Sequence, residues 1–511
     1  MKSNAKELKT VKGVRLILGY IGLMMGLIGI IIALPLVYIL FNSAEWKYAL
    51  SFCIPSLIYI IIGFSLFFSL TYKKKPLRLY RHQNSFIVVI SWLIAIIGCA
   101  LPFVISNRMN FHQAFFEMSS GWATVGLTVY DFEKDTNCFL LARTNTMLFG
   151  GIGIILVMIS LFSDRYGMSL YSAEGHSDRF LPNLLKSSRI ILLIYCSLII
   201  VGTFSYFACG MSFFDAFCHS VTAVSTGGFS THPESLKWFQ GQLSETQYNG
   251  IIIVSMFLML SGSISSISWV FLFKGNFRSF FKSTENIIQF VIFLLFIPLL
   301  FIAFMRDGNG NLNENITNSF FYSFSALTTC GFQIGELSSN LHSAIFVILI
   351  LLMLIGGQSN STSGGMKIIR IHIFIKSIYI KIRNSLTPSN STHSYRIHMS
   401  GAYTNLDDSL MHSNNIFILI YVFVFVIGTF IFSFSRTPLN VIMFEVSSML
   451  SGTGLSTNAL VVASSPNYYF YTASIIMIAG RLEIMAIIYA VLYCINSPYR
   501  FLRNTLERRH K

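Results

Sequence analysis

Long apolar runs separated by short polar segments dominate the sequence. A helix that crosses a bilayer needs about 20 predominantly apolar residues, and runs near that length recur along the chain. We expect membrane spans at 14–41, 47–71, 85–105, 139–162, 188–210, 248–273, 286–305, 342–355, 415–435 and 468–495. Four shorter, moderately apolar segments, at 111–121, 212–223, 315–327 and 438–449, lie between spans and are too short to cross. The pattern predicts an all-α polytopic membrane protein with re-entrant helices.

Composition and charge support this interpretation and set an orientation. The 511 residues are 54% hydrophobic and only 11% charged, yet they carry a net charge of +15, a balance that excludes a soluble enzyme. The segments 1–15, 72–83, 163–189, 274–285, 367–412 and 496–511 hold 28 Lys and Arg against 8 acids. The opposite side holds 7 bases and 12 acids. Because cytoplasmic loops are rich in Lys and Arg, we expect both termini in the cytoplasm. The membrane is expected to be the inner (plasma) membrane. Since orientation accounts for the basic excess, no nucleic-acid partner is expected.

A glycine-containing tetrapeptide follows each of the four short segments, in a fourfold internal repeat. Aligned on the third residue, the copies place glycine at 126, 228, 331 and 454, with a hydroxyl residue six positions upstream in every copy. The candidate ion-binding residues are Thr124, Val125 and Gly126; Thr226, Gly227 and Gly228; Thr329, Cys330 and Gly331; and Gly452, Thr453 and Gly454. Self-similarity at one period is typical of a repeated structural unit, here span, short helix, glycine loop, span.

The physical chemistry of such loops points to a cation pathway. Non-helical backbone at membrane depth is tolerated only where it is buried in protein or lines a water-filled cavity. Four such strands around an axis would form rings of carbonyl oxygens that replace a cation's hydration shell, and the short helices would aim their negative ends at the ion. Thr124-Val125-Gly126 also matches the start of the potassium-channel filter. Four copies in register argue against four unrelated turns.

These motifs resemble the Trk/Ktr/HKT superfamily of cation transporters, and most closely its TrkH-type pore subunits, over about 84–495. The resemblance implies four M1–pore helix–M2 repeats around one ion pathway plus an N-terminal two-helix hairpin. The corresponding units are the hairpin at 1–83, repeats at 84–187, 188–284 and 285–412, and a fourth repeat with a cytoplasmic tail at 413–511. Filter glycines in all four repeats go with potassium (K+) in this superfamily, whereas members with serine in the first repeat tend to pass sodium.

Two further features lie below the predicted filter. The span that starts at 342 is interrupted by a Gly- and Ser-rich stretch, and the last span contains Arg481 and Glu483, an ionisable pair inside a membrane helix. By resemblance, the stretch is an intramembrane gating loop and Arg481 projects into the pathway to oppose cations. The predicted gate residues are Gly356, Gly357, Ser361, Thr362, Gly364, Gly365 and Arg481. Glu483 instead fits an ion pair that fixes helix packing.

One position in the pore helices allows two interpretations. Glu117 and Glu445 stand nine residues before their glycines, where the other copies have His219 and Tyr322. These acids either deepen the negative potential near the filter or pair locally.

The expected function is potassium uptake, with K+ as the transported ion and no other cofactor. Partners implied by the resemblance are membrane lipid, a second copy in a homodimer, and a cytosolic nucleotide-binding regulatory subunit of the TrkA type. A sodium-permeable or sodium- or proton-coupled relative is the alternative, and channel-like conduction and symport both stay open. A membrane enzyme would need a cluster of His, Asp or Glu at membrane depth, which the repeat alignment does not offer. A non-conducting scaffold would leave the fourfold pattern without a purpose.

Overall fold

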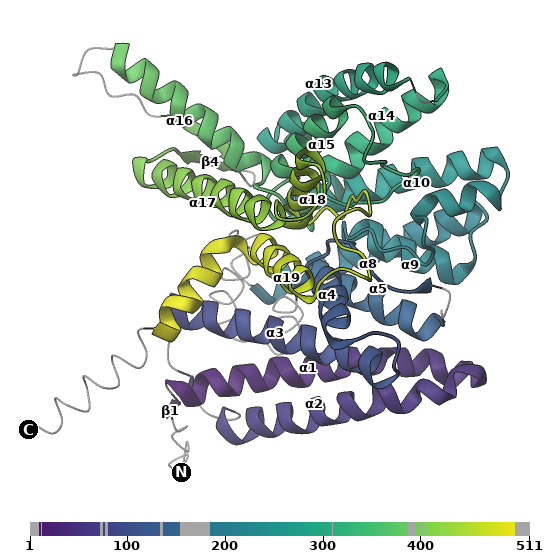
Figure 1. The fold of residues 1–511 in the computed structure, drawn as a ribbon. Helices are drawn as coiled ribbons and strands as arrows, with labels where there is room; N and C mark the ends of the chain where they lie inside the picture. Colours follow the sequence, from purple (N-terminus) through teal and green to yellow (C-terminus); the bar gives the residue numbers. More distant parts are fainter. Residues whose placement is uncertain are drawn as a thin grey trace, which may run out of the picture.

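The computed structural model describes residues 10–11, 13–71, 75–76, 80–132, 136–153, 184–308, 310–386, 395–399 and 402–495. These residues are mostly helical (Figure 1). In the described part, strands form only two short pairs: β1 (Thr10–Val11) is parallel to β2 (Lys75–Pro76), and β3 (Arg396–Met399) is antiparallel to β4 (Ala402–Asn405). The prediction of an all-α chain is confirmed.

Six helical segments are long and apolar enough to cross a membrane. They are α1 (Val14–Phe41), the 3-10 turn η1 (Ser43–Tyr48) continuing into α2 (Ala49–Leu70), α3 (Arg81–Ile105), α8 (Leu184–Ala208), α13 (Thr284–Asp307) and α17 (Asp408–Phe432). The prediction of a polytopic membrane protein is therefore confirmed. In the span expected at 139–162, α5 covers Asn137–Ile152, and positions 154–162 are outside the described residues.

Two spans predicted as continuous are sharply bent instead. In the span expected at 248–273, α10 (Glu245–Ser263) and α11 (Ser266–Phe273) meet at 105°. In the span expected at 468–495, α19 (Asn467–Arg481) and the helix Glu483–Ile495 meet at 108°. The prediction of unbroken helices was wrong at both places, because the bends are stabilised by partners distant in sequence, described below.

The two helices of the N-terminal hairpin pack against each other at glycines, and the tip of the hairpin is hydrogen-bonded to α5. A Cβ atom on Gly63 of α2 would collide with the backbone of Gly26 in α1, so the two helices approach at backbone distance, as small residues permit in membranes. Figure 1 shows the pair running alongside α3. At its tip, the Glu45 carboxylate accepts hydrogen bonds from the backbone N–H groups of Asn137 (3.2 Å) and Cys138 (3.0 Å). Glu45 therefore satisfies the open N-terminus of α5.

All four predicted short helices are present: α4 (Phe111–Trp122), α9 (Phe213–Val224), α14 (Leu312–Leu327) and α18 (Leu439–Ser451). Each packs against the long helix before it, which is α3, α8, α13 or α17, and against the helix after it. The contacts between units are cyclic, because α5 packs on α9, α10 on α14, α15 (Ser343–Ile355) on α18, and α19 on α4. The last unit thereby returns to the first, and the four short helices surround one axis.

The remaining elements lie between these units. They are the 3-10 turn η3 (Ser235–Gly241), α12 (Phe277–Lys282) and α16 (Ile368–Leu386), which resumes the chain after the glycine-rich stretch. α16 packs beside α17 (Figure 1). Ile369, Ile373 and Ile380 on α16 form a small buried cluster with Ile397 of β3 and Leu406, so the β3–β4 hairpin covers an apolar face of α16.

Candidate ion pathway

The four glycine loops share one backbone course. The first residue of each tetrapeptide has a positive φ: 51° at Thr124, 50° at Thr226, 55° at Thr329 and 72° at Gly452. The aligned glycines have φ values of 97°, 72°, 84° and 85°. A left-handed conformation is costly for a threonine, so three such threonines in register indicate a backbone held by its surroundings.

The hydroxyl-bearing position found by sequence alignment anchors each loop to its own short helix. In every copy, the N–H of the residue before the aligned glycine donates to the backbone carbonyl oxygen of the hydroxyl residue six positions upstream of that glycine. The N···O distances are 2.9 Å from Val125 to Ser120, 2.8 Å from Gly227 to Thr222, 3.0 Å from Cys330 to Ser325, and 2.9 Å from Thr453 to Ser448. These bonds continue each short helix directly into its loop.

The loops close into a ring. A Cβ atom on Gly126 would collide with the carbonyl oxygen of Gly227 in the next loop. In the same way, a Cβ on Gly228 would collide with the carbonyl oxygen of Cys330, and one on Gly331 with that of Thr453. A Cβ on Gly454 would collide with the carbonyl oxygen of Val125, which completes the circle. Glycine at each position is therefore required both for its backbone angle and for the approach of its neighbour's carbonyl.

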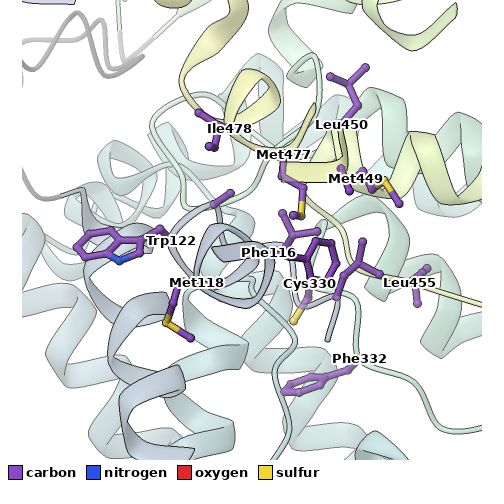
Figure 2. Packing of buried hydrophobic residues seen from close by; sticks show 14 of the residues in the cluster. Phe116, Met118, Trp122, Cys330, Phe332, Met449, Leu450, Leu455, Met477 and Ile478 are labelled. Atoms are coloured by element: carbon purple, nitrogen blue, oxygen red, sulfur yellow. The ribbon is translucent and has the colours of Figure 1, made fainter. Parts of the chain in front are cut away.

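Apolar side chains pack around the ring. Val125, Cys330, Phe332 and Leu455 are fully buried. Figure 2 shows three of them, Cys330, Phe332 and Leu455, among buried residues of the short helices and α19, including Phe116, Met449 and Met477. These side chains belong to the core and cannot contribute polar groups to an ion. The oxygen atoms that the four loops bring together are therefore backbone carbonyls and the hydroxyls of their threonines.

A cavity lies on each side of the ring. One is lined by all four aligned glycines and by the strands that leave them. We call it the outer cavity, because those strands lead to the loops predicted to be outside. The other, which is larger, is lined by Ser361, Gly364, Lys367 and Arg481, among others, and is called the inner cavity. The ring with these two cavities is the candidate pathway.

Six of the seven predicted gate residues, all except Arg481, lie in a compact loop between α15 and α16. α15 ends at Ile355, and Gly356 and Gly365 both have positive φ values, of 71° and 75°. A Cβ on Gly356 would collide with Gly364 and Gly365, so the two ends of the loop touch. At its tip, the hydroxyls of Ser361 and Ser363 are 2.6 Å apart.

This loop contacts the loops of the second, third and fourth units. The Thr362 hydroxyl lies 2.9 Å from the carbonyl oxygen of Val224, which ends α9, and 3.3 Å from the hydroxyl of Thr226. The Gly364 N–H donates to the Thr329 hydroxyl (2.7 Å), and the Gly365 N–H donates to the Ser451 carbonyl (2.9 Å). The loop therefore lies directly against the inner side of the ring.

Arg481 fastens the loop to the first unit. One guanidinium nitrogen donates to the Thr362 carbonyl (2.5 Å), and the other donates to the carbonyls of Gly150 (2.8 Å) and Gly151 (3.1 Å) at the end of α5. The sequence offered no signal for this role of the two glycines. Glu483, at the bend after Arg481, forms an ion pair with Arg370 of α16 at 2.7 Å. The expectation that it fixes helix packing agrees with this contact.

Gln358 is a residue of this region that the sequence did not reveal. Its side-chain oxygen accepts from the Ser265 N–H (3.0 Å) at the α10–α11 break, and its amide nitrogen lies 2.7 Å from Asn286 and 2.5 Å from Gln289 of α13. The next residue, Ser359, donates its N–H to Glu285 (2.7 Å). The bend in the second unit and the loop of the third are therefore joined by one buried amide.

The fold and this geometry define a helical membrane protein in which four glycine loops close a ring around one axis. Residues 50–501 match the model of the TrkH family, described as cation transport protein, and the chain belongs to this family. It is 28% identical over 495 residues to an uncharacterized cation transporter of Methanocaldococcus jannaschii, covering 95% of this chain and 97% of that protein.

Other relatives carry potassium in their names. The Trk system potassium uptake protein TrkG of Escherichia coli is 29% identical over 65% of this chain and 72% of its own length. The potassium uptake protein TrkH of Halomonas elongata is 25% identical over 73% of this chain and 77% of its own. The crystal structure of the potassium transporter TrkH from Vibrio parahaemolyticus superposes with a TM-score of 0.79 at 22% identity, over 93% of this chain and 98% of that one. The two proteins share a fold.

Proposed function

We propose that this chain is the pore subunit of a potassium uptake system and that the ring of four glycine loops is its selectivity filter. The observation that carries the proposal is the closure of the ring, with a backbone carbonyl of each loop against the glycine of the loop before it. Rings of carbonyl oxygens replace the hydration shell of a potassium ion. The named TrkG and TrkH relatives, which are potassium uptake proteins, support the same ion.

Transport would proceed from the outer cavity to the inner one. An ion would lose water as it leaves the outer cavity, bind the carbonyls of the ring, and emerge beneath them. The short helices end at the ring, so their negative ends favour a cation there. The membrane potential supplies about 2.3 kcal/mol per charge per 100 mV, enough to drive accumulation without a covalent step.

We propose that the loop from Gly356 to Gly365, together with Arg481, is the gate. It lies against the ring in this structure, and individual hydrogen bonds connect it to Thr226, Thr329 and Ser451. A loop held by hydrogen bonds can move away from the ring as one body when water molecules replace the ring residues as its hydrogen-bond partners. Arg481 adds a fixed positive charge next to the path, which raises the energy of a cation until the loop and the guanidinium move.

The finer assignments follow from the resemblance and the charge pattern. They are the four repeats from 84 onward around one path, both termini in the cytoplasm, a second copy in a homodimer, and a cytosolic nucleotide-binding subunit of the TrkA type on the basic inner face. Both channel-like flux and coupled symport are compatible with this arrangement.

The test is rescue of a potassium-uptake-deficient bacterial strain at low external potassium, with Gly331→Asp as the matched negative control. Wild type should restore growth and the variant should not, since an aspartate cannot fit beside the Thr453 carbonyl. Gly126→Ser should then lower the potassium-to-sodium permeability ratio in reconstituted vesicles. Failure of an expressed wild type to rescue, with a regulatory partner supplied, would overturn the proposal. An unchanged ratio would remove the filter assignment.

A further inference from the structure

One buried polar position recurs in all four short helices, and one of the residues that occupy it, Glu445, also lines the outer cavity. This position lies nine residues before the filter glycine and is occupied by Glu117, His219, Tyr322 and Glu445. All four side chains are at most 2% exposed. Burying a polar or charged group is costly unless it is hydrogen-bonded, so the partners of these four residues show what the position does.

In every unit the partner is the strand that leaves the filter. Glu117 accepts from the Thr128 hydroxyl (2.8 Å) and the Val129 N–H (3.0 Å), and Glu445 accepts from the Ser456 hydroxyl (2.9 Å) and the Thr457 N–H (2.6 Å). His219 Nε2 lies 3.1 Å from the Ser230 hydroxyl. The Tyr322 hydroxyl donates to the Gly335 carbonyl (2.7 Å) and accepts from the Gly335 N–H (3.1 Å). We call these four residues and their partners the outer clamps.

The clamps are also joined sideways around the outer cavity. Arg143, paired with Glu117 at 2.8 Å, donates to the Ser230 carbonyl of the second unit (3.2 Å). Gln333 of the third unit accepts from the Leu236 N–H (3.1 Å) and donates its side-chain amide to the Ser456 carbonyl of the fourth (2.8 Å). The strands that leave the filter are therefore tied both to their own short helices and to one another.

The clamps complete the attachment of each filter strand. On the inner side, the bond from the residue before the glycine to the short helix fixes where the strand enters the ring. On the outer side, the clamp fixes the strand two to four residues beyond the glycine, so the carbonyls between have little freedom to spread or contract. A ring that distinguishes ions through the number and position of its oxygens depends on that restriction. Buried hydrogen bonds of this kind are strong because the local dielectric is low.

We propose that the outer clamps set cation selectivity from outside the ring, with Glu117, His219, Tyr322 and Glu445 acting as positioning residues. This inference rests on the proposed function of the loops as a selectivity filter. The four clamps differ in chemistry, so they contribute unequally. Selectivity should be most sensitive to substitutions in the first and third clamps. The first contains the buried ion pair of Glu117 with Arg143, and the third depends on the single hydroxyl oxygen of Tyr322.

Tyr322→Phe tests the third clamp with the loss of one oxygen atom. Tyr421→Phe is the matched control, because the Tyr421 hydroxyl is buried in α17 and has no hydrogen-bond partner among the described residues. In reconstituted vesicles, Tyr322→Phe should lower the potassium-to-sodium permeability ratio about threefold to fivefold, the factor that corresponds to most of the net worth of one hydrogen bond. The control should keep the wild-type ratio. Because a permeability ratio does not depend on the amount of folded protein, a loss of stability alone would leave it unchanged.

Glu117→Gln tests the first clamp, with Glu336→Gln as its control. Both remove one negative charge on the outer side, but Glu336 is 79% exposed and only loosely paired with Lys237 at 3.8 Å. A lower ratio for Glu117→Gln alone supports the clamp, whereas equal effects of both substitutions would assign the role to surface charge and overturn it. A selective wild type with unchanged ratios in Tyr322→Phe and Glu117→Gln would also overturn it. A wild type that passes no potassium would instead count against the proposed function itself.

Discussion

Replacing Arg481 by glutamine should release the gate and raise the rate of potassium uptake. In the wild type, one nitrogen of the guanidinium holds the Thr362 carbonyl of the loop, and the other holds the end of α5. Only the first bond resists movement of the loop. A hydrogen bond to a charged group contributes about 1.5–3 kcal/mol, so its loss should shift the balance between closed and open loop by roughly 10- to 150-fold toward open.

The assay is rubidium or potassium uptake into vesicles that contain the purified chain without a regulatory partner. Arg481→Gln should increase the initial rate at saturating potassium by about tenfold or more, the lower end of the range derived from the hydrogen bond. Arg436→Gln is the control, since Arg436 lies in the segment between α17 and α18 and its loss removes the same charge. A folded Arg481→Gln protein with an unchanged or lower rate would refute the role of this bond in closing the path.

Two further substitutions test how the pathway is supported. Gln358→Leu should lower the melting temperature in detergent by several degrees and increase basal uptake. The reason is that it leaves the Ser265 N–H without its partner, at a cost of about 1–3 kcal/mol. An unchanged melting temperature would contradict the inference that the Gln358 amide joins the α10–α11 bend to the loop. Gly63→Leu should destabilise the N-terminal hairpin, because its side chain cannot fit against Gly26, whereas Gly241→Ala, which has open space around it, should leave the thermal melt unchanged. Equal melts for these two variants would argue against close packing of α1 and α2.

Local pattern was sufficient to predict the helical fold and the four short helices. Hydrophobic runs indicated the long helices, and the glycine with its hydroxyl residue six positions upstream identified loops whose backbone angles agree. The reason is that these features are determined by short segments of chain. A glycine that must adopt a positive φ, and a helix too short to cross, are both visible within a dozen residues.

The bend between α10 and α11 could not be predicted in the same way. The apolar run at 248–273 predicts one continuous span. A break in a membrane helix leaves backbone groups without partners, and here Gln358 and Asn360 supply them from nearly a hundred residues away. Local sequence cannot show that such a partner exists. The outer clamps were missed for the same reason: Glu117 and Glu445 were recognised as an aligned pair, but their partners depend on how the strand returns past the helix.

The closure of the ring also has a consequence for biogenesis. The last contact around the circle joins Gly454 to Val125, so the fourth loop meets the first. During synthesis, the ring therefore stays open until the segment that contains Gly454 has been made. The proposed filter exists only once the fourth unit has folded against the first, so insertion of the last helices completes it.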